Sequence, residues 1–118
     1  MIIGIGVDTV QLSRFEAKLA ETPRLKDRLF LDIETVNDGA EASVQTLAGR
    51  FAAKEALAKA LHVPAGLNWQ DCEVINLENG RPVFLFHNQI AELIDGADVH
   101  LSLSHDAGIA SAMVVIER

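Results

Sequence analysis

The order of apolar and polar residues along this chain changes its period several times, and each change predicts a secondary-structure element. Residues 2–7 are an apolar run typical of a buried strand, with two glycines where another element can pack closely. Apolar residues then recur at helical spacing over 11–21, until Pro23 breaks the pattern. A short helix or turn is expected over 25–30, and a loop over 36–42.

The longest predicted helix covers 42–61, a stretch rich in Ala, Leu, Lys and Glu that Pro64 and Gly66 end. Four more strands are expected further on, over 72–77, 81–86, 99–103 and 109–116. Glu78-Asn79-Gly80 predicts a hairpin turn, because Asn-Gly readily adopts positive φ at both central positions. A short helix over 87–94 separates the two pairs of strands. Since hairpins make antiparallel sheets, we predict an α+β fold in which an antiparallel sheet packs against one long helix and shorter helices.

A length of 118 residues fits a single domain over 1–118, and 49% of the residues are hydrophobic. Tyr is absent and aromatic residues make up only 5%, so subunit contacts are a reasonable way to add buried area. The one cysteine, Cys72, excludes an internal disulfide and is expected to be a buried thiol. No signal peptide or membrane-spanning run is visible, which predicts a cytoplasmic protein without a membrane partner.

The net charge of −7 argues against nucleic-acid binding, which draws its affinity from basic surface. The charge is unevenly spread, however, because half of the ten basic residues lie between positions 11 and 30. These five residues are Arg14, Lys18, Arg24, Lys26 and Arg28. A local basic patch on an acidic protein suits an acidic partner, although a solvated helix face explains the same pattern.

Two carboxylates are candidates for holding a divalent cation. Asp8 follows the first apolar strand, where it suits a Mg²⁺ ligand or, alternatively, a cap at a strand-to-helix junction. In the long helix, Phe51, Glu55 and Lys59 fall near one face among alanines, where the helix could approach a strand and bring Glu55 to Asp8. The alternative is an ordinary surface pair between Glu55 and Lys59.

The segment His100-Leu101-Ser102-Leu103-Ser104-His105-Asp106 is the third candidate for chemistry. Its histidines lack metalloprotease spacing and a tandem Ser-His-Asp is not a catalytic triad, so we expect His105 and Asp106 at a strand end beside a substrate. The sequence contains neither a GxGxxG nor a GxxxxGK[ST] phosphate loop. Phosphate chemistry would therefore depend on Mg²⁺ with scattered Arg and Lys residues.

Together these segments resemble the holo-acyl-carrier-protein synthases, a family of phosphopantetheinyl transferases. The matching segments are Gly4-Ile5-Gly6-Val7-Asp8, Arg14, residues 49–60, Gly80-Arg81-Pro82 and residues 100–105. The early Gly-x-Asp combined with the Phe-x-x-Lys-Glu-Ala-x-x-Lys-Ala helix is the specific part of this match. The resemblance extends from the first residues to the last strand.

The resemblance implies transfer of 4′-phosphopantetheine from coenzyme A to a serine of an apo acyl carrier protein, with release of 3′,5′-ADP. It places Mg²⁺ between Asp8 and Glu55, and the serine proton would go to Glu55 or to a water on the metal. The catalytic set that it implies is Asp8, Glu55, Lys59 and His105. The coenzyme-binding set is Arg50, Lys54, Lys59, Gly80, Pro82 and His105.

The resemblance also implies a homotrimer with active sites between subunits, and docking of the acidic carrier protein on Arg14, Arg24 and Arg28. Two other functions remain open at this point. One is a Mg²⁺-dependent hydrolase of a nucleotide or another phosphate ester that uses the same Asp8 and Glu55. The other is a non-enzymatic interaction module whose function rests on the basic patch.

Overall fold

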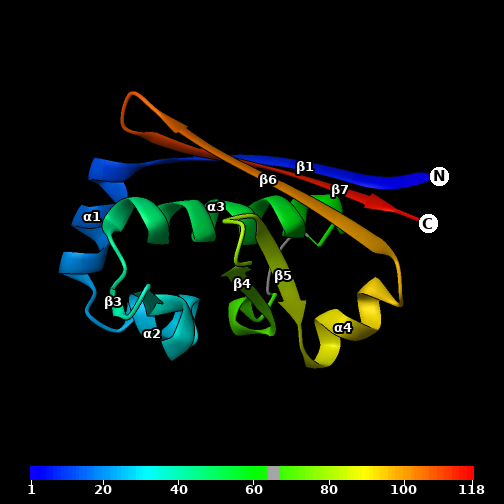
Figure 1. Cartoon of the computed structure of the whole chain (residues 1–118), viewed down its shortest axis with the longest axis horizontal. Helices are drawn as coiled ribbons and strands as arrows, with labels where there is room; N and C mark the ends of the chain where they lie inside the picture. The colour runs from blue at the N-terminus through cyan, green and yellow to red at the C-terminus, as the bar shows by residue number, and fades with distance from the viewer. Residues whose placement is uncertain (64–66) are drawn as a thin grey trace.

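The computed structural model describes residues 1–63 and 67–118, which fold around one long helix, α3 (Val44–Ala60). An antiparallel sheet with the spatial order β1-β7-β6 lies along this helix (Figure 1). Its strands are β1 (Ile2–Gln11), β6 (Asp98–Asp106) and β7 (Ile109–Glu117). Because β1 pairs with β7, the two ends of the chain lie side by side.

The other side of α3 is covered by two small hairpins and by short helices (Figure 1). The hairpins are β2 (Val36–Asn37) with β3 (Ala40–Glu41), and β4 (Cys72–Asn76) with β5 (Pro82–Phe86). The helices are α1 (Leu12–Glu21), α2 (Leu25–Leu29), α4 (Asn88–Ile94) and the 3-10 turns η1 (Asp32–Thr35) and η2 (Trp69–Asp71). The predicted α+β class is confirmed. None of the helices that the structure describes is long and apolar enough to cross a membrane.

Two glycines bring β1 unusually close to α3. A Cβ added to Gly6 would lie 1.8 Å from the carbonyl oxygen of Ala56, and one added to Gly4 would lie 2.1 Å from that of Ala60. Any side chain would therefore push the strand off the helix, which confirms the predicted close packing. Since side chains alternate along a strand, Asp8 shares the face of Gly4 and Gly6 that is turned toward α3.

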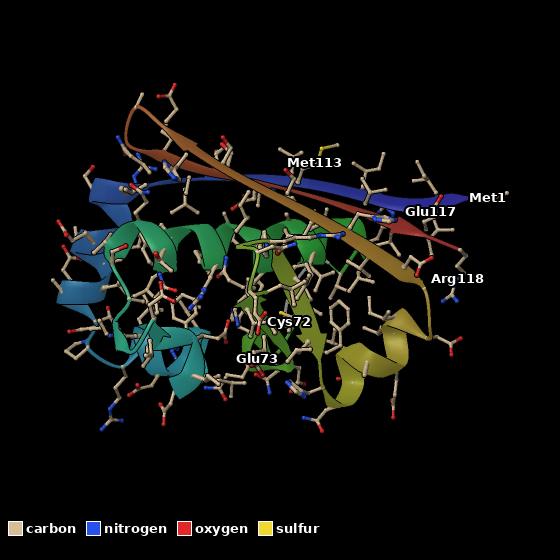
Figure 2. All side chains as sticks on the ribbon, in the orientation of Figure 1. Met1, Cys72, Glu73, Met113, Glu117 and Arg118 are labelled. Carbon is tan, nitrogen blue, oxygen red and sulfur yellow. The ribbon has the colours of Figure 1, made fainter. Side chains whose placement is uncertain are left out.

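The prediction of a buried first strand is wrong for its other face. Ile3, Ile5 and Val7 are 45%, 54% and 52% exposed, and Met113 of β7 lies beside them on the side of the sheet opposite α3 (Figure 2). An apolar run predicts that both faces of a strand are covered, but the described chain covers only the face turned toward α3. β1 also continues to Gln11, so Asp8 lies within the strand instead of following it.

The remaining boundaries differ from the predictions in small ways. Helix α3 begins after Ser43, whose hydroxyl accepts a hydrogen bond from the Thr46 amide, and the proposed stop at Pro64 and Gly66 lies outside the described residues. The expected loop over 36–42 contains the β2–β3 hairpin. In the β4–β5 turn only Gly80 has a positive φ, of 85°, so the expectation of two such residues is wrong.

Candidate active site

Asp8 and Lys59 form a half-exposed ion pair where β1 meets the end of α3. The Lys59 ammonium donates to Asp8 Oδ1 at 2.9 Å and to the Val7 carbonyl oxygen at 2.9 Å. The other carboxylate oxygen, Asp8 Oδ2, is buried and has no hydrogen-bond partner among the described residues. Because a buried anionic oxygen without a partner is costly, Oδ2 is positioned for a ligand that the chain itself does not supply.

Glu55 lies one helical turn before Lys59 and next to Asp8. Partial burial, the negative charge of Asp8 and a hydrogen bond that the protonated Glu55 carboxyl can donate to Asp8 together raise the pKa of Glu55 to about 7, whereas Lys59 and Lys18 oppose the shift. The structure thus brings Asp8, Glu55 and Lys59 together. Among the described ion pairs Lys59 contacts Asp8 and not Glu55, so the alternative of a simple Glu55–Lys59 surface pair is wrong.

The Asp8–Glu55 pair suits a hard divalent cation, because it offers carboxylate oxygens of which one lacks a partner. Within residues 1–63 and 67–118 there is no group of three or more His, Cys, Asp and Glu side chains that could hold a metal ion. The described residues therefore offer a pair of carboxylates here and not a full set of such ligands. Mg²⁺ is commonly held in this way, by one or two carboxylates together with water and substrate phosphates.

A small cavity of about 190 Å³ opens beside Glu55, between α1 and α3. Arg14 and Lys18 line it from α1, and Phe51 and Glu55 line it from α3. Arg14 and Lys18 are exposed and lie one helical turn apart. The cavity therefore connects the basic surface of α1 directly with Glu55.

A second cavity of about 210 Å³ brings together Arg50 and His105, which are far apart in the sequence. The His105 ring is held by Gln45, with 3.0 Å between the two Nε2 atoms. Arg50 donates to the Glu34 carbonyl oxygen and, at 3.0 Å, to Asn76 Oδ1. Its Nε finds no partner in the described part of the chain. A buried cation with unused N–H groups at a cavity wall suits an anionic ligand.

Arg50 also lines a larger groove of about 640 Å³ beside the β4–β5 turn. Gly80, a predicted coenzyme-binding residue, also lines this groove. Pro82 begins β5 and is paired with Asn76. Burial lowers the pKa of the Arg50 guanidinium, and the nearby Glu34 carboxylate opposes this shift.

Lys54 does not fit its predicted role in coenzyme binding. Its side chain is fully buried, and its ammonium donates to Glu34 Oε1 at 2.8 Å and to the Trp69 carbonyl oxygen at 2.6 Å. No ligand reaches an ammonium that the fold encloses in this way. Helix α3 directs Lys54 into the core, whereas Glu55, the next residue along, lies at the surface.

Sequence reasoning missed Glu34, which is only 1% exposed. Besides Lys54, its carboxylate accepts hydrogen bonds from the backbone amides of Leu31 and Val74 at 3.0 Å each. Glu34 lies in an acidic stretch that looks like a solvated loop, so only the Phe, Ala and Leu residues around Lys54 in α3 hint that a buried anion must exist. Of the predicted carrier-docking residues, Arg14, Arg24 and Arg28 are all exposed.

Known proteins share both the sequence and the fold. Residues 4–110 match the sequence profile of the 4′-phosphopantetheinyl transferase superfamily. The chain is 50% identical over 122 residues to the holo-[acyl-carrier-protein] synthase of Salinispora arenicola, and each chain is covered in full.

Two solved structures superpose on nearly the whole chain. The ACPS–CoA complex of Chronobacterium ammoniagenes gives a TM-score of 0.84 at 26% identity, and covers 97% of this chain and 96% of its own. The holo-(acyl-carrier-protein) synthase of Bacillus anthracis, in complex with CoA (3′,5′-ADP), gives a TM-score of 0.78 at 36% identity, and covers 99% and 97%.

Proposed function

The chain belongs to the 4′-phosphopantetheinyl transferase superfamily as an enzyme of the holo-acyl-carrier-protein synthase group, and we propose that it uses Mg²⁺ to modify an apo acyl carrier protein. In the proposed reaction a carrier serine oxygen forms a bond to the β-phosphorus of coenzyme A. The bond from that phosphorus to the bridging oxygen breaks, and 3′,5′-ADP leaves. The observation that carries this proposal is the unpartnered Asp8 Oδ2 beside Glu55 and Lys59.

We assign Asp8 and Glu55 as the two protein ligands of Mg²⁺. When bound, the cation would neutralise charge on the pyrophosphate of coenzyme A. The raised pKa of Glu55 supports this assignment, because burial and the charge of Asp8 both disfavour the ionised carboxylate. A positive ion between the two side chains would remove that penalty.

Lys59 and Glu55 have separate roles in this proposal. The Lys59 ammonium uses two N–H groups on Asp8 and Val7, and its side chain is 55% exposed, so a further N–H remains for a phosphate oxygen. Glu55 lines the cavity next to α1, on the side from which a carrier docked on Arg14 would approach. We therefore assign the Glu55 carboxylate oxygen that would not hold the cation as the acceptor of the serine proton.

Coenzyme A is proposed to extend from this pair toward Arg50 and His105. These two side chains line one cavity, and Arg50 retains unused N–H groups for an anionic part of the coenzyme. Gly80 and Pro82 lie at the neighbouring turn, where Gly80 lines the adjoining groove. Lys54 is left out of this binding set because it is buried against Glu34.

The acidic carrier protein is proposed to dock on the basic patch of α1 and α2. Arg14, Arg24 and Arg28 are exposed there, and Arg14 shares a cavity with Glu55. A carrier that binds Arg14 would thus bring its serine close to the proposed proton acceptor. The cytoplasmic location expected from the sequence remains a prediction.

We further propose that the protein is a homotrimer with active sites between subunits. The support is the exposed apolar face of the sheet, formed by Ile3, Ile5, Val7 and Met113, which a second subunit would cover. Analytical ultracentrifugation of the wild type and of Ile5→Glu tests this. Three subunits are expected for the wild type and fewer for the variant, whereas a monomeric wild type would contradict the proposal.

Mass spectrometry of an apo carrier protein, incubated with the enzyme, coenzyme A and Mg²⁺, tests the reaction. The carrier should gain the mass of one phosphopantetheine, and 3′,5′-ADP should appear in equal amount. Hydrolysis of coenzyme A without modification of several different carriers would support a phosphate-ester hydrolase instead. Carrier binding without any turnover would support an interaction module.

A further inference from the structure

Arg50 occupies a central place in the proposed coenzyme site. It lines the 210 Å³ cavity with His105, and it also lines the 640 Å³ groove with Gly80. Asn76 is among the few other residues that line both spaces. The orientation of one guanidinium group therefore affects two neighbouring hollows in the surface.

The protein holds this guanidinium from two sides. On the buried side, the Glu34 carbonyl oxygen accepts from Nη1, and the Glu34 carboxylate is itself fixed by Lys54. On the outer side, Asn76 Oδ1 accepts from Nη2 at 3.0 Å. Arg50 is only 5% exposed, whereas Asn76 is exposed at the end of β4. Asn76 is thus the part of this support that can be removed without opening the core.

Asn76 also connects Arg50 with the β4–β5 turn. Its Nδ2 donates to the Gly80 carbonyl oxygen at 3.0 Å while its Oδ1 accepts from Arg50. One amide side chain therefore links the cation to the turn that also lines the groove. The positive φ of Gly80, 85°, places that carbonyl where the amide can reach it.

We propose that Asn76 is a positioning residue, which fixes the Arg50 guanidinium relative to the Gly80 turn before coenzyme A binds. The inference rests on the proposed function, because Arg50 is taken to bind an anionic group of the coenzyme. A planar guanidinium recognises phosphate through a fork of N–H groups, so its orientation matters as much as its charge. Holding that orientation in advance avoids an ordering cost on binding.

Asn76→Ala tests the proposal because it removes both hydrogen bonds and leaves the charge of Arg50 in place. The KM for coenzyme A should rise about three- to tenfold, the range expected for loss of one ordinary hydrogen bond. The kcat should change by less than about twofold, since Asn76 is placed at neither the metal pair nor the proton acceptor. Asn68→Ala is the matched control, because Asn68 Oδ1 also accepts a local hydrogen bond, from the Gln70 amide, and lines neither hollow. It should leave both constants unchanged.

A double-mutant cycle with Arg50→Gln separates positioning from direct contact with the ligand. In the Arg50→Gln background, Asn76→Ala should have no further effect on the dissociation constant of coenzyme A measured by calorimetry. Arg50→Met provides a second background if Arg50→Gln folds poorly. Independent, additive effects would overturn the proposal, because Asn76 would then act on the coenzyme or the fold without Arg50.

The outcome distinguishes this inference from the proposed function. If the wild type binds coenzyme A but modifies no carrier, the cycle still reports on Asn76, and only the proposed reaction fails. If the wild type modifies the carrier and Asn76→Ala has an unchanged KM, the positioning role fails and the reaction stands. A rise in KM with an equal fall in kcat in Asn76→Ala, together with a lower Tm, would indicate a purely structural residue.

Discussion

Helix α3 carries two lysines that each meet a carboxylate, and the two pairs differ in almost every other respect. Lys54 and Glu34 are fully buried, 2.8 Å apart, and each Glu34 carboxylate oxygen has a partner. Lys59 and Asp8 meet at the surface, 2.9 Å apart, and Asp8 Oδ2 has no partner in the described chain. The first pair is complete within the fold, whereas the second is incomplete without a ligand.

This difference shows how a structural ion pair can be told from a functional one. A buried ion pair holds its segments together only if each of its oxygens and N–H groups has a hydrogen-bond partner. Glu34 meets this condition through Lys54 of α3, Val74 of β4 and Leu31 just before η1. A binding site must instead keep polar atoms unsatisfied until its ligand arrives. The sequence motif contains both lysines, and it is the surroundings of each that separate their roles.

The largest effect is expected from removing one charge of the Asp8–Glu55 carboxylate pair. Glu55→Gln and Asp8→Asn should each abolish carrier modification, a loss of about a thousandfold or more, because the cation site loses a ligand. Both variants should remain folded, since they are close in shape to the wild-type residues. Transfer rates at saturating Mg²⁺ and circular dichroism check the two statements, and a wild-type transfer rate in either variant would contradict the ligand assignment.

Replacing each lysine by methionine compares the two pairs directly. Lys54→Met leaves Glu34 as an uncompensated buried charge, so the free energy of unfolding should fall by about 3–5 kcal/mol. Lys59→Met breaks a half-exposed pair and should cost less than about 1 kcal/mol, while carrier modification falls sharply. Urea unfolding and transfer assays measure both properties. A Lys54→Met variant of wild-type stability would remove the basis of the comparison.

The close approach of β1 to α3 is what positions Asp8 beside Glu55. Gly6→Ala should destabilise the protein by about 1–3 kcal/mol, because the new methyl group collides with the Ala56 carbonyl oxygen. Gly49→Ala is the matched control: its methyl group would meet only Leu103, at 3.9 Å, so this helical substitution should stabilise by about 0.5–1 kcal/mol. Equal effects of the two substitutions in thermal unfolding would contradict the packing argument.

Charge reversal on α1 should affect the carrier and spare the coenzyme. Arg14→Glu is expected to raise the KM for the carrier about tenfold, since it places a negative charge in the docking patch. Arg118→Glu changes the charge equally at the opposite end of the molecule and should have little effect (Figure 2). Steady-state kinetics with each substrate varied in turn provide the measurement. An unchanged carrier KM in Arg14→Glu would count against the docking role.

The smallest expected effect is a pH dependence of stability in the absence of metal. The pKa of Glu55 is raised from 4.5 to about 7 in the fold. Because the folded-state pKa lies above the unfolded one, the protonated Glu55 carboxyl contributes to the free energy of unfolding. This contribution is fully present below pH 4.5 and is lost as the pH rises through about 7. Glu55→Gln should therefore have a higher Tm than the wild type at pH 8 in EDTA, and a similar Tm at pH 4. Parallel Tm curves would show that Glu55 is not strained by Asp8.

Most of the fold was predictable from the sequence because periodicity and turn residues are local signals. They placed α1, α3, α4 and the last two hairpins, and the α+β class followed from those hairpins. The pairing of β1 with β7 joins the two ends of the chain and has no local signal. The exposure of Ile5 and Val7 was missed for a similar reason, since only the arrangement of the sheet decides which face is covered.

The site was predictable in part. Asp8 and Glu55 were expected to meet because Gly4, Gly6 and the alanines of α3 allow a strand and a helix to come close. Lys54 was misassigned because the motif fixes its spacing but not the direction of its side chain. Its partner Glu34 is distant in the sequence, and nothing local distinguishes a buried glutamate from a solvated one.

The central claim is that Asp8 and Glu55 form a cation site. Calorimetric titration of Mg²⁺ at pH 8 in the presence of coenzyme A tests it most directly. The wild type and Lys54→Met, measured where the variant is still folded, should both bind one Mg²⁺ per site. Glu55→Gln and Asp8→Asn should show no binding in the same range. Equal Mg²⁺ binding by the wild type and by both carboxylate variants would contradict the account.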